Sequence, residues 1–187
     1  MLKSRGFTLI ELMTVIVIAA ILMAIAAPSF KDFLAKKRVE GVLTELATDL
    51  QFARSEAVQR NANVRVTFGT GCYVIHTVGS TATSCTQSGG ASPGTGAVEI
   101  KTVKLDAGST VSFSPNESLT YVMFDSVRAM ASWDGTNEQA DGEEDTGSIN
   151  VNSSVGAWQL RASINPMGRT KTCSPDGSVS GYSSTAC

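Results

Sequence analysis

Residues 7–27, FTLIELMTVIVIAAILMAIAA, form an almost unbroken apolar run that decides the fold of the N-terminal part of the chain. The run has 21 residues, which is long enough for an α-helix to cross the hydrocarbon core of a membrane. It contains a single carboxylate, Glu11. Placing an ionised carboxylate at the centre of a bilayer costs about 2.5–3.5 kcal/mol. We therefore expect Glu11 to have a binding partner or a functional role.

Two ordinary interpretations of this run fit less well. A secretory signal has an apolar core of about 7–15 residues followed by a small-residue cleavage site. Residues 24–26 match such a site loosely, but Pro28 follows closely and Glu11 would interrupt the core. A simple single-pass anchor explains the length of the run but not its carboxylate.

The residues in front of the run form a short polar leader. Lys3 and Arg5 give the leader two positive charges, and Gly6 directly precedes Phe7. The sequence GFTLIE, residues 6–11, resembles the processing site of type IV pilins and pseudopilins. This resemblance covers the charges, the glycine junction and the spacing of the glutamate.

The resemblance implies a processing pathway and an assembly residue. Prepilin peptidase is expected to remove residues 1–6 by cutting after Gly6, and the new amino terminus, Phe7, is expected to be methylated. Glu11 is expected to act in filament assembly by neutralising an amino terminus of the growing filament.

A second helical segment follows the apolar run. Apolar residues recur there at steps of three and four residues, with one step of eight. This pattern predicts an amphipathic helix with one stripe to bury and a solvated face that includes Asp49. The stripe consists of Phe30, Leu34, Val42, Leu46, Leu50, Ala53 and Ala57. Pro28 removes one backbone hydrogen bond, so we expect it to kink a helix that otherwise runs from about Phe7 to about Arg60. Residues 61–63 should end this helix.

Beyond residue 63 the pattern changes to period two, which is typical of half-buried strands. The candidates are residues 64–68, 73–78, 98–103 and 158–164, with shorter ones at 111–113, 120–124, 149–151 and 169–173. Loops rich in Gly, Ser and Thr are expected at residues 86–96 and 134–147. The sequence therefore predicts an α+β fold, with a long N-terminal helix packed on an antiparallel β-rich head.

Two further segments refine the family resemblance. Residues 46–58, LATDLQFARSEAV, resemble the helix of the GspH/FimT group of minor pilins and pseudopilins. Residues 164–169, INPMGR, followed by Cys173, resemble the C-terminal Gly-Arg strand of that group. The group implies that residues 7–29 are the transmembrane or filament-core half of a pilin-like helix. Residues 30–187 would then be the amphipathic half-helix and a periplasmic head.

This resemblance implies a structural subunit of a type IV pilus or of a type II secretion pseudopilus, inserted in the inner membrane. Its expected partners are other pilin subunits, contacted through the N-terminal helix, prepilin peptidase and the membrane. An alternative is a DNA receptor in natural transformation, because Arg169 and Lys171 form a local basic motif. Family members implicated in DNA uptake tend to carry Gly-Arg-x-Arg there, and Lys171 departs from that pattern. The competing interpretation of Arg169 is a strand residue at the edge of the core.

Composition limits the other function classes. The length of 187 residues suits one domain plus an anchor. Removal of Lys3 and Arg5 leaves 13 basic and 17 acidic residues, a net charge of −4. This balance argues against bulk nucleic-acid binding.

The four cysteines form two sequence-local pairs. Export to an oxidising compartment makes disulfides the default state. Of the three possible pairings, we expect the local one, Cys72 with Cys85 and Cys173 with Cys187. The two loops enclose 12 and 13 residues. Each such disulfide would stabilise the fold by about 3 kcal/mol in the chain-entropy model.

Motifs for catalysis or metal binding are weak. His76 is the only histidine and lies in a strand-like segment, so we interpret it as a strand side chain rather than a zinc ligand. Acidic residues that could hold calcium lack EF-hand spacing and favour a solvated loop; they are Asp134, Glu138, Asp141, Glu143, Glu144 and Asp145. No nucleophile or phosphate-loop motif accompanies them. We therefore expect no enzyme, no cofactor and no metal, with an anchored periplasmic enzyme as the weakest alternative.

Overall fold

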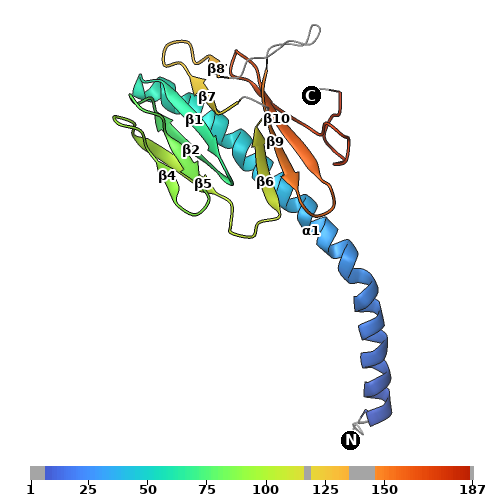
Figure 1. Cartoon of the computed structure of the whole chain (residues 1–187). Coiled ribbons are helices and arrows are strands. Elements are labelled where there is room, and N and C mark those ends of the chain that lie inside the picture. Colours follow the sequence, from blue (N-terminus) through green and yellow to red (C-terminus); the bar gives the residue numbers. More distant parts are fainter. Residues whose placement is uncertain (1–6, 116–118, 135–145, 186–187) are drawn as a thin grey trace, which may run out of the picture. The chain divides into compact units, whose positions relative to one another are not determined.

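Helix α1 (Leu9–Arg60) leads into a series of short strands in the computed structural model, which describes residues 7–115, 119–134 and 146–185 (Figure 1). The chain divides into two compact units, Met1–Leu34 and Ala35–Cys187, and each is described here by itself. We call the second unit the head. It contains the last part of α1 and all the strands.

Helix α1 ends where the sequence predicts. Asn61 adopts a left-handed conformation with a φ of 50°, which asparagine tolerates better than most residues. The Asn61 N–H donates to the carbonyl of Val58, and the Ala62 N–H donates to the carbonyl of Ala57, both over 3.2 Å. These two bonds form a Schellman motif, which satisfies carbonyl groups at the helix end.

The part of α1 within the head buries one stripe of side chains. Its fully or nearly fully buried apolar residues are Val39, Leu43, Leu46, Leu50, Ala53 and Ala57. The sequence prediction is confirmed from Leu46 onward and in part for Val42, which is half-buried and packs against the core. It is wrong for Phe30 and Leu34, which are 61% and 38% exposed because they lie in the first unit, outside the core of the head. Leu43, which was not predicted, is more deeply buried than Val42.

A five-stranded antiparallel sheet has the order β5-β2-β1-β7-β8. Its strands are β1 (Val64–Gly69), β2 (Cys72–Thr77), β5 (Glu99–Lys104), β7 (Tyr121–Phe124) and β8 (Ala131–Trp133). In β1, Val64, Val66 and Phe68 are buried while the residues between them are half-buried, as period two predicts. Strand β8 was not predicted, because three residues are too short to show an alternating pattern.

A four-stranded sheet has the order β11-β10-β9-β6, and its paired strands are also antiparallel. Its strands are β6 (Val111–Pro115), β9 (Gly147–Ser153), β10 (Gln159–Ile164) and β11 (Thr170–Cys173). Each overlaps one of the predicted strand segments. Strand β11 lies at one edge of this sheet and therefore has one unpaired side.

A small hairpin of β3 (Ser84–Thr86) and β4 (Gly90–Ser92) packs on β2. The prediction of a loop over residues 86–96 is therefore wrong in part. The segment is rich in Ser and Gly, and its strands arise from tertiary contacts rather than from local preference. A Cβ at Gly69 would overlap the carbonyl oxygen of Cys85, so glycine allows the hairpin backbone to approach β1 closely.

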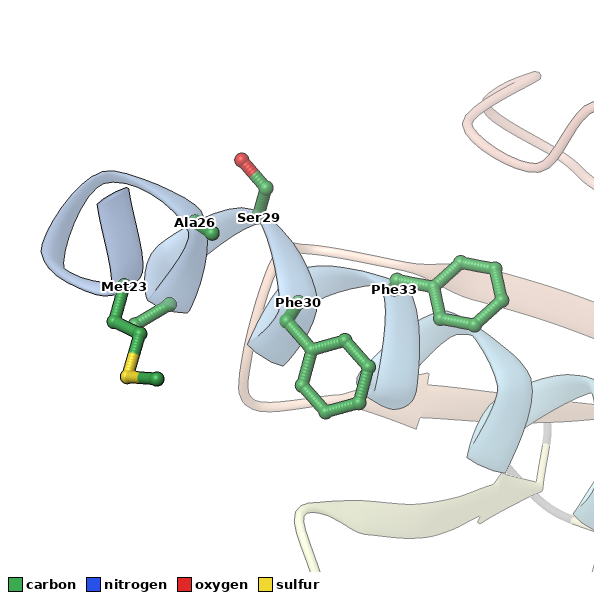
Figure 2. A pocket seen from close by; sticks show the side chains of 6 residues that line it. Met23, Ala26, Ser29, Phe30 and Phe33 are labelled. Carbon is green, nitrogen blue, oxygen red and sulfur yellow. The ribbon is translucent and has the colours of Figure 1, made fainter. Parts of the chain in front are cut away.

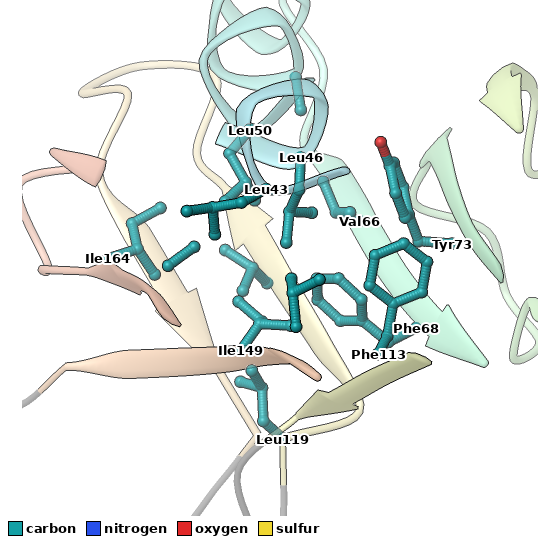
Figure 3. Packing of buried hydrophobic residues seen from close by; sticks show 14 of the residues in the cluster. Leu43, Leu46, Leu50, Val66, Phe68, Tyr73, Phe113, Leu119, Ile149 and Ile164 are labelled. Carbon is teal, nitrogen blue, oxygen red and sulfur yellow. The ribbon is translucent and has the colours of Figure 1, made fainter. Parts of the chain in front are cut away.

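The core of the head lies where α1 meets both sheets. Figure 3 shows Leu43, Leu46 and Leu50 projecting from the helix toward side chains of the strands. The labelled partners from the strands are Val66, Phe68, Tyr73, Phe113, Ile149 and Ile164. Fully burying a side chain of this kind stabilises the fold by about 1.5–3 kcal/mol. All buried members of this core come from Val39 onward, so the head contains its complete core.

The cysteines follow the predicted local pairing as far as the described residues extend. Cys72 and Cys85 form a disulfide that fastens the β3–β4 hairpin to β2. Cys173 is fully buried and disulfide-bonded, while its predicted partner, Cys187, lies outside the described residues. The tail after β11 is held by backbone bonding between Ser174 and Ser183 and by the buried side chain of Val179.

Candidate functional site

The most distinctive surface of the chain is the first part of α1. Every residue from Phe7 to Leu34 is exposed except Ala19, which is half-buried. Among the described residues, α1 is long and apolar enough to cross a membrane. An apolar surface of this extent marks a site of contact with lipid or with other protein chains.

A polar cap begins this apolar helix. The Glu11 N–H donates to the hydroxyl oxygen of Thr8 over 3.3 Å, and the Leu12 N–H donates to the carbonyl of Thr8 over 3.1 Å. Thr8-x-x-Glu11 is the spacing of a capping box. Glu11 thus lies in the first helical turn, where the helix dipole favours a negative charge. The sequence analysis did not identify Thr8, although the Thr-x-x-Glu spacing could have revealed it.

The predicted processing site lies at the boundary of the described residues. Phe7 is 79% exposed, two residues before the helix begins. Gly6 lies outside the described residues. Glu11 lies four residues after Phe7, the predicted new amino terminus.

Pro28 lies inside α1. Residues before and after it in the helix line a shallow apolar hollow. Its lining residues are Met23, Ala26, Ala27, Ser29, Phe30 and Phe33. Figure 2 shows the side chains of Met23, Phe30 and Phe33 projecting from the helix. The expected kink at Pro28 stays a prediction.

In the head, the two segments that carry the family resemblance contact each other. Gln51 Nε2 donates to the Gly168 carbonyl over 3.4 Å and to the Thr170 hydroxyl over 2.9 Å, and Arg54 Nε donates to the carbonyl of Ala129 over 3.0 Å. Gly168 has a φ of +73°, and a Cβ there would come within 2.9 Å of the Ala129 oxygen. The glycine of the Gly168-Arg169 motif is therefore required by both backbone conformation and space.

The two residues predicted as possible DNA contacts are both exposed. Arg169 immediately precedes β11, and its N–H donates to the side-chain oxygen of Asn165 over 2.9 Å. Lys171 lies within β11, opposite Ser163 of β10. Both cations therefore lie at the edge of the four-stranded sheet.

A buried polar network in the head was not predicted. Asp49, expected on the solvated face of the helix, is 5% exposed. It accepts hydrogen bonds from the Tyr73 hydroxyl over 2.7 Å and from Lys101 Nζ over 2.8 Å. The sequence around Asp49 did not indicate that it is buried, because its two hydrogen-bond partners come from strands more than 20 residues away.

His76 is a strand side chain, as predicted. It lies in β2 and is 2% exposed. One ring nitrogen lies 2.8 Å from the Thr77 carbonyl oxygen and the other lies 2.8 Å from the Thr67 hydroxyl. Burial lowers the pKa of His76, which favours the neutral ring that these two contacts accommodate.

The predicted acidic loop falls largely outside the described residues, which include only Asp134 of its six carboxylates. Asp134 accepts hydrogen bonds from the backbone N–H groups of Thr120 and Tyr121 over 2.9 and 3.2 Å. Burial opposes ionisation of Asp134, but a hydrogen bond from the Thr120 hydroxyl, together with these two backbone bonds, outweighs it and holds its pKa below the usual range. Within the described residues, no cluster of His, Cys, Asp and Glu could hold a metal ion.

Comparison with known families matches residues 43–177 to the type II transport protein GspH and residues 1–27 to the prokaryotic N-terminal methylation motif. The first match covers more than half of the chain. The chain belongs to the GspH family. This GspH-family chain thus combines the predicted N-terminal processing motif with the head of that family.

Similar proteins are fimbrial subunits. The GspH-family chain is 52% identical to fimbrial protein EcpB of Eikenella corrodens over 48 residues, which cover 26% of this chain and 30% of that protein. It is 54% identical to the type IV major alpha-pilin of Moraxella bovis over 43 residues, covering 23% and 27%. The match thus spans less than a third of either relative.

The fold is that of a known minor pilin. The crystal structure of the type IV minor pilin FimU of Pseudomonas aeruginosa superposes with a TM-score of 0.50 and 14% identity. The superposition covers 74% of the GspH-family chain and 90% of that structure. At this identity the likeness establishes the fold alone. It confirms the predicted arrangement of a long N-terminal helix on antiparallel sheets.

Proposed function

We propose that this GspH-family chain is a structural subunit of a type IV pilus or of a type II secretion pseudopilus. The observation that carries the proposal is the exposed apolar helix that begins with the Thr8–Glu11 cap. The core of the described head takes no buried side chain from residues 7–34, so this apolar part of α1 is not needed to fill that core. It is available for the membrane before assembly and for other helices afterwards.

The proposed sequence of events begins at the inner membrane. Prepilin peptidase cuts between Gly6 and Phe7, the Phe7 amine is methylated, and the apolar helix anchors the subunit with its head in the periplasm. The subunit then leaves the membrane for a filament whose core is a bundle of such helices. Each large apolar side chain kept from water in that bundle favours assembly by about 1.5–3 kcal/mol.

Glu11 supplies the specific contact in this proposal. A carboxylate within a helix bundle is tolerated only when it is paired or protonated. The Phe7 amine, from the same subunit or from a neighbour, is the cation expected at that depth. The capping bond from Glu11 N–H to Thr8 fixes the backbone of the first turn, so the carboxylate is presented in a defined position.

The DNA-receptor alternative has less support. Its residues, Arg169 and Lys171, are exposed, but the described surface provides no aromatic ladder or groove-reading helix beside them. The negative net charge also repels a polyanion. We therefore retain the structural role.

The role of Glu11 can be tested by substitution in cells that assemble the filament. Glu11→Gln keeps the size of the side chain and removes its charge, and Glu11→Val also removes its polarity. Both variants should be cleaved and inserted in the membrane, but should enter sheared filaments at least about tenfold less than wild type. A tenfold loss corresponds to about 1.4 kcal/mol of assembly free energy.

Thr14→Val is the matched control. Thr14 lies about one turn further along the same helix, and its hydroxyl donates to the carbonyl of Glu11 over 2.9 Å. This variant adds apolar surface without removing a charge, so it should assemble normally. Normal assembly of both Glu11 variants would contradict the proposed role of the carboxylate.

A further inference from the structure

Basic side chains gather on α1 just beyond its apolar part. Residues 31–40 contain four basic and two acidic residues, whereas the rest of the chain from Phe7 onward contains nine basic and fifteen acidic residues. This short segment is therefore positive in a chain that is otherwise negative. Three of its cations, Lys36, Lys37 and Arg38, belong to the head, and we call them the basic collar.

The basic collar occupies the sides of the helix that do not face the core. Ala35 and Val39, which flank the collar in sequence, are both buried. Successive residues of an α-helix are rotated by about 100° around its axis, so the three cations leave α1 in three different directions. Lys37 and Arg38 are exposed, and Lys36 is half-buried.

Contacts within the head hold two of these cations in place. Lys36 Nζ donates to the Ser180 hydroxyl over 3.0 Å and lies 5.7 Å from the centre of the Trp158 ring. Lys37 Nζ pairs with the Glu40 carboxylate over 2.6 Å. Of these contacts, only the one with Glu40 brings in a negative charge. The collar therefore keeps an excess of positive charge.

The collar directly follows the exposed apolar surface of α1. Phe30 and Phe33 are both exposed and extend that surface beyond Ala27. Lys36 follows Phe33 by three residues, which is about 4.5 Å along the helix. This separation is set by the helix itself and does not depend on the angle between the two units. The headgroup layer on each side of a bilayer is about 5–8 Å thick, so a helix with Phe33 at the edge of the hydrocarbon presents the collar to that layer.

We propose that the basic collar binds the phosphate groups of anionic phospholipids around the anchored helix. This inference rests on the proposed function, because it requires a helix anchored in a membrane. Headgroups surround a membrane-spanning helix on every side, and the collar presents cations on several sides. Each Lys or Arg near an anionic membrane surface strengthens attachment to it.

This contact would set the depth of the anchored subunit. Movement of the helix deeper into the membrane carries the cations into the hydrocarbon, which is costly. Movement in the other direction separates the cations from the phosphates. The bound headgroups thus hold the subunit at one height before it enters a filament.

Competition between two lipids measures this binding. The full-length chain in a neutral detergent is mixed with equal amounts of phosphatidylglycerol, which is anionic, and phosphatidylcholine, which is zwitterionic. Native mass spectrometry counts the lipids that stay bound. We expect a preference for phosphatidylglycerol of at least about fivefold, falling below about twofold in Lys37→Gln/Arg38→Gln. Glu40→Gln should raise the preference, because it releases Lys37 from its internal partner.

The control variant Arg128→Gln/Arg169→Gln removes the same charge from exposed positions elsewhere on the head. The residues beside them, Ala129 and Gly168, lie against Arg54, which is sixteen residues, or about 24 Å, beyond the collar on α1. This control should keep the wild-type preference. A general loss of folding cannot explain the whole pattern, because Glu40→Gln acts in the opposite direction to the collar variant.

Three results would overturn the headgroup contact: no lipid preference in the wild-type chain, an unchanged preference in the collar variant, or an equal loss in the control. Each of them leaves the proposed function intact, because cleavage and filament entry are measured separately. Absence of the wild-type chain from both membranes and filaments would contradict the proposed function and the headgroup contact together.

Discussion

The Tyr73 hydroxyl donates a hydrogen bond to Asp49 Oδ2 over 2.7 Å, and this bond joins strand β2 to helix α1 inside the head. Lys101 Nζ, from β5, lies 2.7 Å from the same carboxylate oxygen. Burial, together with the bond to Asp49 and its charge, raises the pKa of Tyr73. The hydroxyl therefore stays protonated and remains a donor at physiological pH. The helix is held on the sheet by this charge-assisted network as well as by apolar packing.

The first prediction follows from this network. Tyr73→Phe should lower the free energy of unfolding of the head by about 1.5–3 kcal/mol, because a hydrogen bond to a buried carboxylate is lost. Urea unfolding of residues 35–187 measures the change. Tyr182→Phe, which removes a hydroxyl from a half-buried tyrosine in the C-terminal tail, is the control and should change stability by less than about 0.5 kcal/mol. Equal effects of the two variants would show that the Asp49 bond contributes nothing specific.

A second prediction concerns Gly168. Gly168→Ala should destabilise the head by more than about 1–2 kcal/mol, because the left-handed backbone disfavours a Cβ and the Ala129 oxygen occupies its space. Gly96→Ala separates these two causes. Gly96 has a similar φ of +79°, but no heavy atom lies within 4 Å of the place that a Cβ would take, so it should show the backbone cost alone. Thermal unfolding of both variants measures the difference, and a smaller loss at Gly168 than at Gly96 would refute the close contact.

The pattern of correct and wrong sequence predictions has a physical explanation. Periodicity located α1 and the longer strands, because a helix or strand with one buried face repeats its apolar residues. The Asn61 stop was visible because few residues accept the left-handed conformation. Strand β8 and the β3–β4 hairpin were missed, because such short or small-residue strands depend on their tertiary partners rather than on their own composition.

The candidate site was predicted unevenly for related reasons. Glu11 and Pro28 lie on one continuous helix and Phe7 lies two residues before it, so their sequence spacing alone indicates their order along this segment. The Asp49–Tyr73–Lys101 network joins residues that are far apart in sequence. No local pattern marks Asp49 as buried, since polar residues on a helix are usually solvated. The contacts of Gln51 and Arg54 with the Gly168 turn likewise required the folded head.

A third prediction concerns pH. Burial holds the folded-state pKa of His76 below its unfolded value of about 6.5. Between these two values the unfolded chain binds a proton that the folded chain does not, so the free energy of unfolding falls as pH decreases through about 6.5. His76 is the only histidine, so His76→Gln should remove most of the change between pH 7.5 and 5.5. Urea unfolding at both pH values tests this; an undiminished pH dependence in the variant would assign it to other groups.

A fourth prediction separates the structural subunit from a DNA receptor. The head should bind duplex DNA weakly or not at all, because the motif of the receptor alternative contains only two cations, Arg169 and Lys171. If those two residues contact phosphates, the slope of log K against log salt should be about −2, from roughly −0.9 per contact. Titration of residues 35–187 with labelled duplex at low and moderate salt measures this. Tight binding that disappears in an Arg169→Gln/Lys171→Gln variant, but not in an Arg128→Gln/Lys104→Gln control, would favour the receptor.

The central claim is that this chain is processed at the Gly6–Phe7 bond and built into a filament through the helix that follows. The most direct test is mass spectrometry of the full-length chain recovered from sheared filaments. We expect a mature chain that begins with N-methylated Phe7 and has lost residues 1–6. A filament fraction that lacks the chain, or a recovered chain that still begins at Met1, would contradict it.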